Sequence, residues 1–334
     1  MTIPLKMKAI ALPSPSGDFT LNEVTVDVPQ RVPGQHLIKV EAVGLNPVDA
    51  KLARSGVEGW QYPHIMGFDA VGTVVECDDG NPLGPGKRVM IHASLTSQGV
   101  LSEYISVPSH ALIEIPDSVS NSTAATVPCA GLTAYLSIER LDLKEDQTLL
   151  IEGGSGAVGQ FAIQMAHYLG YRVITTASPD KFAYLRSLGA EHVIDYKAQD
   201  IVEQIMAITM DRGVDAVLDT IGGEVTSRCV KVLKFAGSIA CLVEYQPIDY
   251  KLLFKKAPQL ISISLGGAWL SNDMCAQLKM AFIGNKMMNC IGKGDFKVPK
   301  VLPVPFEADA ISDALQRQFD GHVFGKQVVM LKQS

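Results

Sequence analysis

The feature that most constrains this chain is a regular alternation of short β-branched segments with amphipathic segments between residues 148 and 243. Apolar runs such as TLLIE, RVITTA and HVID alternate there with stretches of helical spacing such as AVGQFAIQMAHYLG. Strands that alternate with helices form βαβ units, which assemble into a parallel, doubly wound sheet. The pattern therefore predicts an α/β domain of the Rossmann type.

The turn after the first predicted strand carries the pattern Gly154-x-Gly156-x-x-Gly159. In dinucleotide-binding loops the first glycine permits a tight turn, the second lets a pyrophosphate approach the backbone, and the third lets the helix pack closely on the strand. The N–H groups of the helix N-terminus would bind the phosphates. The alternative is a glycine-rich strand-to-helix turn that binds no ligand. We expect a cofactor to be bound by Gly154, Ser155, Gly156, Ala157, Val158 and Gly159.

The residue that selects between NAD and NADP usually lies about 20 residues further on, where NAD meets an acidic side chain. Here the second predicted strand ends in Thr176-Ala177-Ser178, with Lys181 close behind. Ser178 and Lys181 are able to bind a 2′-phosphate, so we expect NADPH. The same stretch also suits the start of a helix, with Ser178 as the N-cap and Asp180 in the first turn. Both interpretations stay open, and Asp180 counts most against NADPH.

The first third of the chain has a different character. Short alternating runs such as HLIKVEAVG and AVGTVVEC are separated by turn residues such as DDGNPLGPGKR. This pattern predicts a mostly-β, barrel-like domain. We therefore expect three parts: residues 1–128, a β-rich domain; 129–270, the nucleotide-binding domain; and 271–334, a C-terminal segment of strand, helix and strand.

Composition excludes several classes of function. The net charge of −6 gives no reason to expect nucleic acid or an anionic membrane as a partner. The start of the sequence lacks the apolar run of a signal peptide, and no uncharged apolar stretch is long enough to span a bilayer. The six cysteines contain no CxxC pair, which argues against a disulfide framework and against a structural zinc site. We expect a cytoplasmic protein.

Asp69 is a carboxylate between two glycines in the otherwise apolar run PHIMGFDAVGTV. Burying an acid costs several kcal/mol unless a partner compensates it. The residues alone leave three interpretations open: a metal site, the relic of one, or a place where a sheet bends.

Further motifs are spread over most of the chain: VGLNPVDAKLARSG (43–56), YPHIMGFDAVGTVVE (62–76), GKRV (86–89), SEYISVP (102–108), PCAGLTAYLSI (128–138), SLGAEHVIDY (187–196), GVDAVLDTIGG (213–223) and the terminal GKQVVML. In their order and spacing they resemble the medium-chain dehydrogenases/reductases, specifically the zinc-free quinone oxidoreductase branch. The resemblance implies a GroES-like β domain, a Rossmann domain, and a C-terminal segment that returns to the former. It also implies a homodimer.

In the zinc alcohol dehydrogenases of this superfamily, a Cys, a His-Glu pair and a second Cys hold the catalytic metal. By resemblance these positions fall here at Asn46, at Phe68 and Asp69, and at Cys129. Catalytic zinc needs three protein ligands, and one thiol does not hold it. We therefore expect no metal, an Asp69 that is hydrogen-bonded within its domain, and a packed thiol at Cys129.

A missing Lewis acid restricts the chemistry. Hydride transfer to a simple ketone would lose several kcal/mol of transition-state stabilisation, whereas a conjugated acceptor spreads the incoming charge over its own π-system. We expect a zinc-independent, NADPH-dependent oxidoreductase that reduces a quinone or an α,β-unsaturated carbonyl. The alternatives are an enoyl-thioester reductase and a catalytically idle, crystallin-like protein that binds NADPH.

The resemblance also suggests individual site residues. Asn46, Tyr62 and Thr133 are the catalytic candidates; each also has a structural interpretation, as a turn asparagine, an aromatic lining residue and a helix-interior hydroxyl. The cofactor candidates outside the glycine loop are Ser178, Lys181, Tyr196, Leu265 and Lys326.

Four other residues are expected to play lesser parts. Asp49 is expected to be structural, and Trp269 to shape the substrate pocket. His92 and His322 are conceivable proton donors, but a lone histidine is more often a packing or surface residue.

Overall fold

The computed structural model describes residues 3–321 and 323–331, and it divides the chain into two compact units. Unit 1 contains the described residues up to Leu132 and from Leu265 onward, and unit 2 contains Thr133–Ser264. The sequence placed these boundaries after residues 128 and 270, a few residues away. His322 lies outside the described residues. No helix in the described part of the chain is long and apolar enough to cross a membrane.

Unit 2 is built on a six-stranded sheet in which every neighbouring pair is parallel. Its strand order is β11-β10-β9-β12-β13-β14, a doubly wound arrangement that confirms the predicted Rossmann-type fold class. The strands are β9 (Thr148–Glu152), β10 (Arg172–Ala177), β11 (His192–Asp195), β12 (Val214–Asp219), β13 (Leu233–Cys241) and β14 (Gln259–Ser262).

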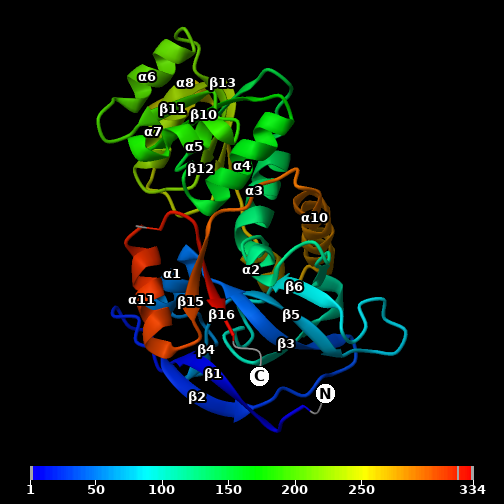
Figure 1. Cartoon of the computed structure of the whole chain (residues 1–334). Coiled ribbons are helices and arrows are strands. Elements are labelled where there is room, and N and C mark those ends of the chain that lie inside the picture. Colours follow the sequence, from blue (N-terminus) through cyan, green and yellow to red (C-terminus); the bar gives the residue numbers. More distant parts are fainter. Residues whose placement is uncertain (1–2, 322, 332–334) are drawn as a thin grey trace. The chain divides into compact units, whose positions relative to one another are not determined.

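Helices pack around this sheet (Figure 1). They are α4 (Ala157–Tyr168), η2 (Pro179–Lys181), α5 (Phe182–Ser187), α6 (Ile201–Ile208), α7 (Val225–Val232) and α8 (Tyr250–Lys256). The core between strands and helices includes fully buried aliphatic side chains such as Leu150, Ile205 and Val217. Such β-branched and leucine side chains are what the apolar runs of the sequence supply.

Unit 1 is the β-rich domain expected from the first third of the chain. A small sheet has the order β2-β1-β4, and a larger one has the order β15-β16-β3-β5-β6-β8, with β7 paired to β3. The strands are β1 (Lys6–Leu12), β2 (Asn22–Asp27), β3 (Gln35–Gly44), β4 (His64–Ile65), β5 (Asp69–Glu76), β6 (Arg88–His92), β7 (Tyr104–Pro108), β8 (Ile113–Glu114), β15 (Val301–Pro305) and β16 (Lys326–Met330).

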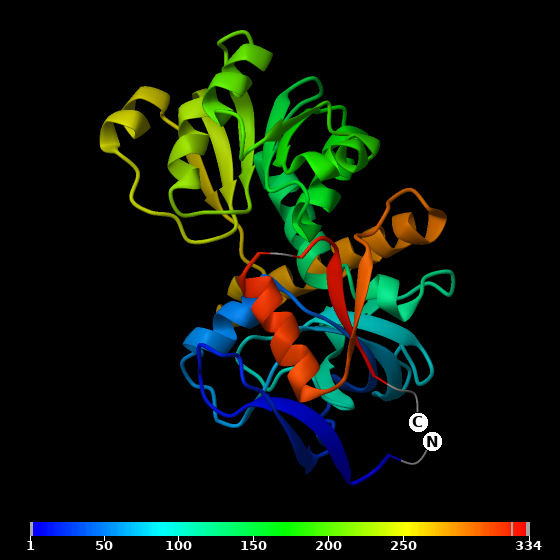
Figure 2. The same cartoon turned by 60° about the vertical axis from the view of Figure 1, so that its left-hand side comes forward.

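The helices of unit 1 come from both ends of the chain. They are α1 (Pro47–Ser55), η1 (Ser109–Ala111), α2 (Asn121–Ala124), α9 (Gly266–Leu270), α10 (Met274–Lys293) and α11 (Ala308–Phe319). Helix α3 (Pro128–Leu141) begins in unit 1 and continues into unit 2. Strand β16, drawn in red in Figure 2, pairs with β3, and β15, drawn in orange, pairs with the other side of β16. The C-terminal segment thus joins the N-terminal β domain.

The register of the large sheet brings four strand ends together. Gly44 at the end of β3 pairs with Asp69 at the start of β5, and Asp69 pairs in turn with His92 at the end of β6. On the other side of β3, Gly44 pairs with Val328 of β16, whose first residue is Lys326. Residues distant in sequence therefore meet at one edge of the sheet.

Candidate active site

The glycine loop lies at the carboxyl end of β9, between β10 and β12. A Cβ atom on Gly154 would lie 2.0 Å from Oγ1 of Thr175, and one on Gly159 would lie 2.6 Å from the carbonyl oxygen of Gly153. Close packing therefore requires glycine at both positions. A Cβ on Gly156 would meet only the carbonyl oxygen of Gly153, at 3.4 Å, so the backbone there stays open to a ligand. Gly156 is also the N-cap of α4. The loop fits the pyrophosphate of a dinucleotide.

Three of the predicted cofactor-binding residues, Ser178, Lys181 and Tyr196, lie at this same edge of unit 2. Ala177 of β10 pairs with Asp195 of β11, so Ser178 and Tyr196 follow neighbouring strand ends. The Tyr196 side chain is 51% exposed. Lys181 ends the short helix η2, three residues after Ser178.

Asp180 interacts with two of these three residues, Ser178 and Lys181. The Ser178 hydroxyl donates to Oδ1 of Asp180 at 2.7 Å, and the Lys181 ammonium contacts Oδ2 of the same carboxylate. The hydrogen bonds from Lys181 and Ser178 hold the pKa of Asp180 below its usual value. A helix does begin at Pro179, but Ser178 makes no side-chain capping bond to it. The helix-start interpretation is therefore right for the backbone and wrong for the Ser178 hydroxyl.

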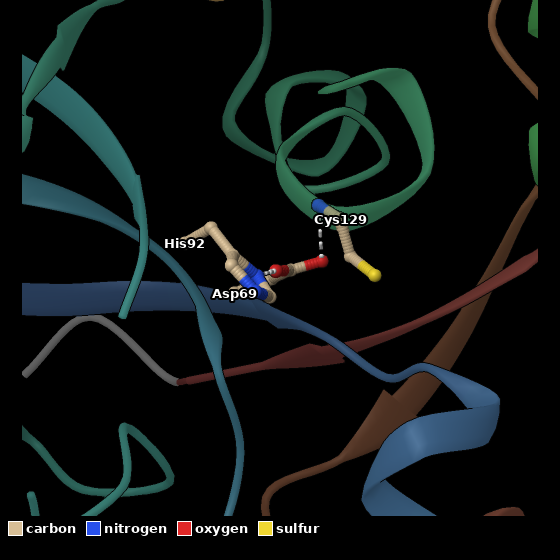
Figure 3. A group of neighbouring side chains, drawn as sticks. All are labelled: Asp69, His92 and Cys129. Atoms are coloured by element: carbon tan, nitrogen blue, oxygen red, sulfur yellow. Dashed lines mark hydrogen bonds and ion pairs between the residues drawn. The ribbon is translucent and has the colours of Figure 1, made fainter. Parts of the chain in front are cut away.

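Asp69 is the centre of a buried polar cluster in unit 1 (Figure 3). Its Oδ1 accepts a hydrogen bond from Nδ1 of His92 at 2.7 Å, because an ionised carboxylate has no proton to donate. Its Oδ2 accepts from the Asn46 amide at 2.9 Å and from the backbone N–H of Cys129 at 3.0 Å. Burial disfavours the charged form, yet the Lys326 charge and the bonds from His92 and Asn46 hold the pKa of Asp69 below its usual value. The structure confirms that Asp69 is hydrogen-bonded within its domain.

Lys326 supplies the positive charge of this cluster. Its side chain is 3% exposed, its Nζ lies 3.4 Å from Oδ2 of Asp69, and it also donates to the side-chain amide oxygen Oδ1 of Asn46. The Asn46 amide nitrogen in turn donates to the carbonyl of Gly44 at 3.3 Å. Both ends of the Asn46 amide are thus engaged inside the cluster, and its catalytic role stays a prediction.

Asp49 adds a second buried carboxyl group to the cluster. Its Oδ2 accepts the backbone N–H of Asn46 at 2.7 Å, and its Oδ1 has no hydrogen-bond partner among the described residues. Burial, and after it the charge of Asp69, raises the pKa of Asp49 to about 7. The protonated form of this carboxyl group is therefore favoured far more than in an exposed aspartate.

The cluster contains three side chains of the kind that bind transition metals. Asp69, His92 and Cys129 each offer one ligand atom, and these atoms lie within 4.8 Å of one another. However, Lys326 already contacts the only carboxylate of this set, and a divalent ion there would face its ammonium directly. Phe68, at the position of the family's histidine, is an apolar buried side chain. In this arrangement the residues do not fit a catalytic zinc.

The remaining predicted site residues lie in different places. Tyr62 is 38% exposed, and its ring lies edge-on to Trp60 with 6.5 Å between the centroids. Thr133 is half-buried in α3, at the first residue of unit 2, and Leu265 is buried just before α9, at the first residue of the C-terminal part of unit 1. Their proposed roles stay predictions.

Unit 1 also contains a cavity of about 590 Å³. Trp269 lines it, as do Asn272 and Gln277, and the Trp269 indole N–H is buried without a hydrogen-bond partner among the described residues. Ile91 lines the cavity, whereas the adjacent His92 bonds to Asp69. Successive side chains of a strand point to opposite faces, so the cavity and the Asp69 cluster lie on opposite sides of β6.

Sequence reasoning missed two members of the Asp69 cluster. His92 was set aside as an ordinary histidine, and Lys326 was assigned to the cofactor alone. One signal was available: Lys326 and Asp69 are single opposite charges that each begin an apolar strand, KQVVM and DAVGTVV. Lone opposite charges in buried strands tend to be paired.

Comparison with known proteins adds independent observations. The family model "Zinc-binding dehydrogenase" matches residues 157–280, and "Alcohol dehydrogenase GroES-like domain" matches residues 32–117. A trans-enoyl reductase of Aspergillus terreus is 35% identical over 225 residues, which cover 62% of this chain and 74% of that protein. A mitochondrial NAD(P)H oxidoreductase of Bos taurus is 32% identical over 224 residues, covering 60% of this chain and 56% of that protein. The match thus spans little more than half of the bovine protein.

Solved structures resemble the whole chain. The quinone oxidoreductase of Coxiella burnetii is 27% identical with a TM-score of 0.81, covering 98% of this chain and 100% of that one. A mycobacterial protein solved in complex with NADPH is 26% identical with a TM-score of 0.85, covering 97% and 100% of the two chains. Together with the glycine loop, these relatives support a nicotinamide cofactor for this chain.

Proposed function

Because the chain belongs to the medium-chain dehydrogenase/reductase superfamily, in its zinc-free quinone oxidoreductase-like branch, we propose that it is an NADPH-dependent reductase of quinones or α,β-unsaturated carbonyls that works without a metal ion. The observation that carries this proposal is the buried Lys326–Asp69 pair. By resemblance, Asp69 falls at one of the positions that hold the catalytic metal in the zinc members of the superfamily. An ammonium at this place leaves no Lewis acid to activate a simple ketone.

The proposed roles follow from the geometry of each unit. When bound, NADPH supplies a hydride from C4 of its nicotinamide ring. The open backbone at Gly156 and the N-terminus of α4 bind its pyrophosphate, and Ser178, Lys181 and Tyr196 bind its 2′-phosphate. That hydride, together with one proton from solvent, would reduce the acceptor's conjugated system by two electrons. The acceptor's own π-system spreads the charge in between, so the protein's main task is to position the two reactants.

Replacing Lys181 with alanine should weaken NADPH binding by about tenfold, because a charge-assisted hydrogen bond to the 2′-phosphate is lost. The Asp180→Asn variant should bind NADPH more tightly than the wild type, because Lys181 and Ser178 are then no longer held by a carboxylate. Fluorescence titration with NADPH measures both effects, and NADH, which lacks the phosphate, is the control. Equal shifts for the two cofactors would show that these residues do not contact the 2′-phosphate.

The function itself is tested by following NADPH oxidation with a panel of acceptors. Turnover is expected with 9,10-phenanthrenequinone and with 2-alkenals. A preference for a 2-enoyl thioester would favour the second candidate, an enoyl-thioester reductase, which the names of the Aspergillus relatives support. Tight NADPH binding without oxidation by any acceptor would instead identify the catalytically idle protein and refute the proposal.

A homodimer and a cytoplasmic location are part of the same proposal. The strand β14 is the last of its sheet, and its Leu260 side chain is 39% exposed. Such an edge offers N–H and C=O groups to a strand of a second copy. A cytoplasmic location fits the absence of any cysteine-pair motif from the sequence.

A further inference from the structure

We propose that Asp69, His92 and Cys129 form a potential transition-metal site and that the ammonium group of Lys326 prevents a metal ion from binding there. The site would bind Zn²⁺ or Co²⁺ only after the ammonium is removed. The chain thus retains three potential metal ligands. The metal is excluded by the positive charge of Lys326 and not by a lack of ligands. This inference concerns metal binding and does not depend on the proposed reaction.

The three donors suit a borderline or soft divalent cation. Carboxylate oxygen, imidazole nitrogen and thiolate sulfur are the ligand types that zinc prefers, and a site with three protein ligands keeps a fourth position open. Zinc lies about 2.0–2.3 Å from such atoms, so donors around one ion are roughly 3.3–3.8 Å apart. The ligand atoms here lie within 4.8 Å of one another, so shifts of about an ångström bring them into range.

The donors are also held in place before any ion arrives. The backbone N–H of Cys129 donates to Asp69 at 3.0 Å, and His92 donates to the other oxygen of the same carboxylate at 2.7 Å. Asp69 is fully buried and His92 is 5% exposed, so both are shielded from competing water. A metal would replace the hydrogen bond between His92 and Asp69, whereas the backbone bond of Cys129 would keep its thiol near the carboxylate.

Lys326 blocks this site both by charge and by position. Its Nζ lies 3.4 Å from Oδ2 of Asp69, so an incoming dication would meet an ammonium at the same carboxylate. The side chain has little freedom to withdraw, because its stem passes close to Gly44, where an added Cβ would lie 3.1 Å from Cε. Its backbone is fixed by the parallel pairing of β16 with β15, in which Val301 faces Lys326.

The test is a titration with Co²⁺, followed by the near-ultraviolet absorption of a cobalt–thiolate bond and the visible bands of tetrahedral cobalt. The wild type should show no stoichiometric binding. The Lys326→Met variant, which keeps the length of the side chain without its charge, should bind one Co²⁺ per chain at least about 100-fold more tightly than the wild type. The Lys326→Arg variant keeps a cation and should resemble the wild type.

Matched cysteine variants identify the ligand. In the Lys326→Met background, Cys129→Ser should abolish the thiolate band, whereas Cys275→Ser, at an exposed cysteine on α10, should leave it unchanged. The Lys326→Gln variant removes the charge but keeps an N–H donor for the Asn46 side chain. It repeats the test in case the methionine variant folds poorly. Zn²⁺ should raise the melting temperature of either variant, because an ion that binds only the folded state stabilises it.

Three results would overturn the inference. Stoichiometric Co²⁺ with a thiolate band in the wild type would show that Lys326 does not close the site. A folded Lys326→Met or Lys326→Gln variant that binds no Co²⁺ would show that the three donors do not form a site. Failure of both variants to fold even with Zn²⁺ present would show the same, since a formed site would support the fold.

Discussion

Replacing Asp69 with alanine is expected to lower the free energy of unfolding by about 3–5 kcal/mol, the usual cost of breaking a buried ion pair from one side. The substitution leaves the Lys326 ammonium 3% exposed with its nearest carboxylate removed, and it leaves the donors of His92 and Asn46 without their acceptor. Urea denaturation of the wild type and the variant measures the loss. The exposed Asp180 provides a control, since Asp180→Ala removes an acid at the surface and should change stability little.

A double variant separates the ion pair from the loss of packing. In the Lys326→Met background, Asp69→Ala should cost less than it costs in the wild type, because no unpaired ammonium is left behind and only the donors of His92 and Asn46 lose their acceptor. Asp49 should make the stability loss of Asp69→Ala depend on pH. Since the charge of Asp69 contributes to its raised pKa, Asp49 should ionise more readily in Asp69→Ala and act in part as a counter-ion for Lys326. The loss should therefore be larger at pH 5 than at pH 8. Equal costs of the Asp69 change with and without Lys326 would contradict the pairing.

The second large effect is expected from Gly156→Val, which should weaken NADPH binding by about 100-fold or more while the domain stays folded. The added side chain enters the open space over the loop, where a Cβ meets only one carbonyl oxygen at 3.4 Å. It would displace the pyrophosphate and so remove several charge-assisted hydrogen bonds, each worth about 1.5–3 kcal/mol. The N-cap preference for glycine over valine adds about 1 kcal/mol of destabilisation at most. Isothermal titration with NADPH and thermal unfolding measure the two quantities separately.

Two other glycines serve as controls for this experiment. Gly154→Ala places a Cβ 2.0 Å from Oγ1 of Thr175, so it should damage the fold itself. Gly17→Val, in unit 1, meets nothing within 4 Å and should change neither stability nor binding. If Gly156→Val binds NADPH as tightly as the wild type, the pyrophosphate does not pass over this part of the loop.

The fold of unit 2 was predictable because its determinants are local. The period of the apolar residues separates strands from helices, and their strict alternation predicts a parallel, doubly wound sheet, whose strand order the structure then supplies. The glycine loop was predictable for the same reason, since Gly154 and Gly159 are required by contacts with Thr175 and Gly153 within a short stretch of sequence.

The Asp69 cluster was only partly predictable, because its members are brought together by strand register. Asp69 was expected to find partners within its domain, and it does. Which partners it finds depends on β3 lying between β5 and β16, a fact that no spacing in the sequence contains. Lys326 is 257 residues away from Asp69. The resemblance to a family supplied the return of the C-terminal segment, but not the direction of the Lys326 side chain.

The surroundings of Ser178 and Lys181 show a second limit of prediction from the sequence, which concerns side-chain hydrogen bonds. The stretch Ser178-Pro179-Asp180 allowed two interpretations, a 2′-phosphate site and a helix start with Ser178 as the N-cap. In the structure a helix begins at Pro179, but the Ser178 hydroxyl donates to the Asp180 carboxylate and does not cap the helix. A side chain of this size has several acceptors within reach, and small energy differences choose among them.

The central claim is that hydride passes from the nicotinamide ring to a conjugated acceptor without help from a divalent ion. The most direct measurement combines one turnover of NADPH dideuterated at C4 and a 2-alkenal with elemental analysis of the same protein sample. The account predicts one deuterium at the β-carbon of the saturated product, an unchanged rate after treatment with a chelator, and far less than one zinc per chain. A stoichiometric zinc whose removal abolishes the transfer would contradict it.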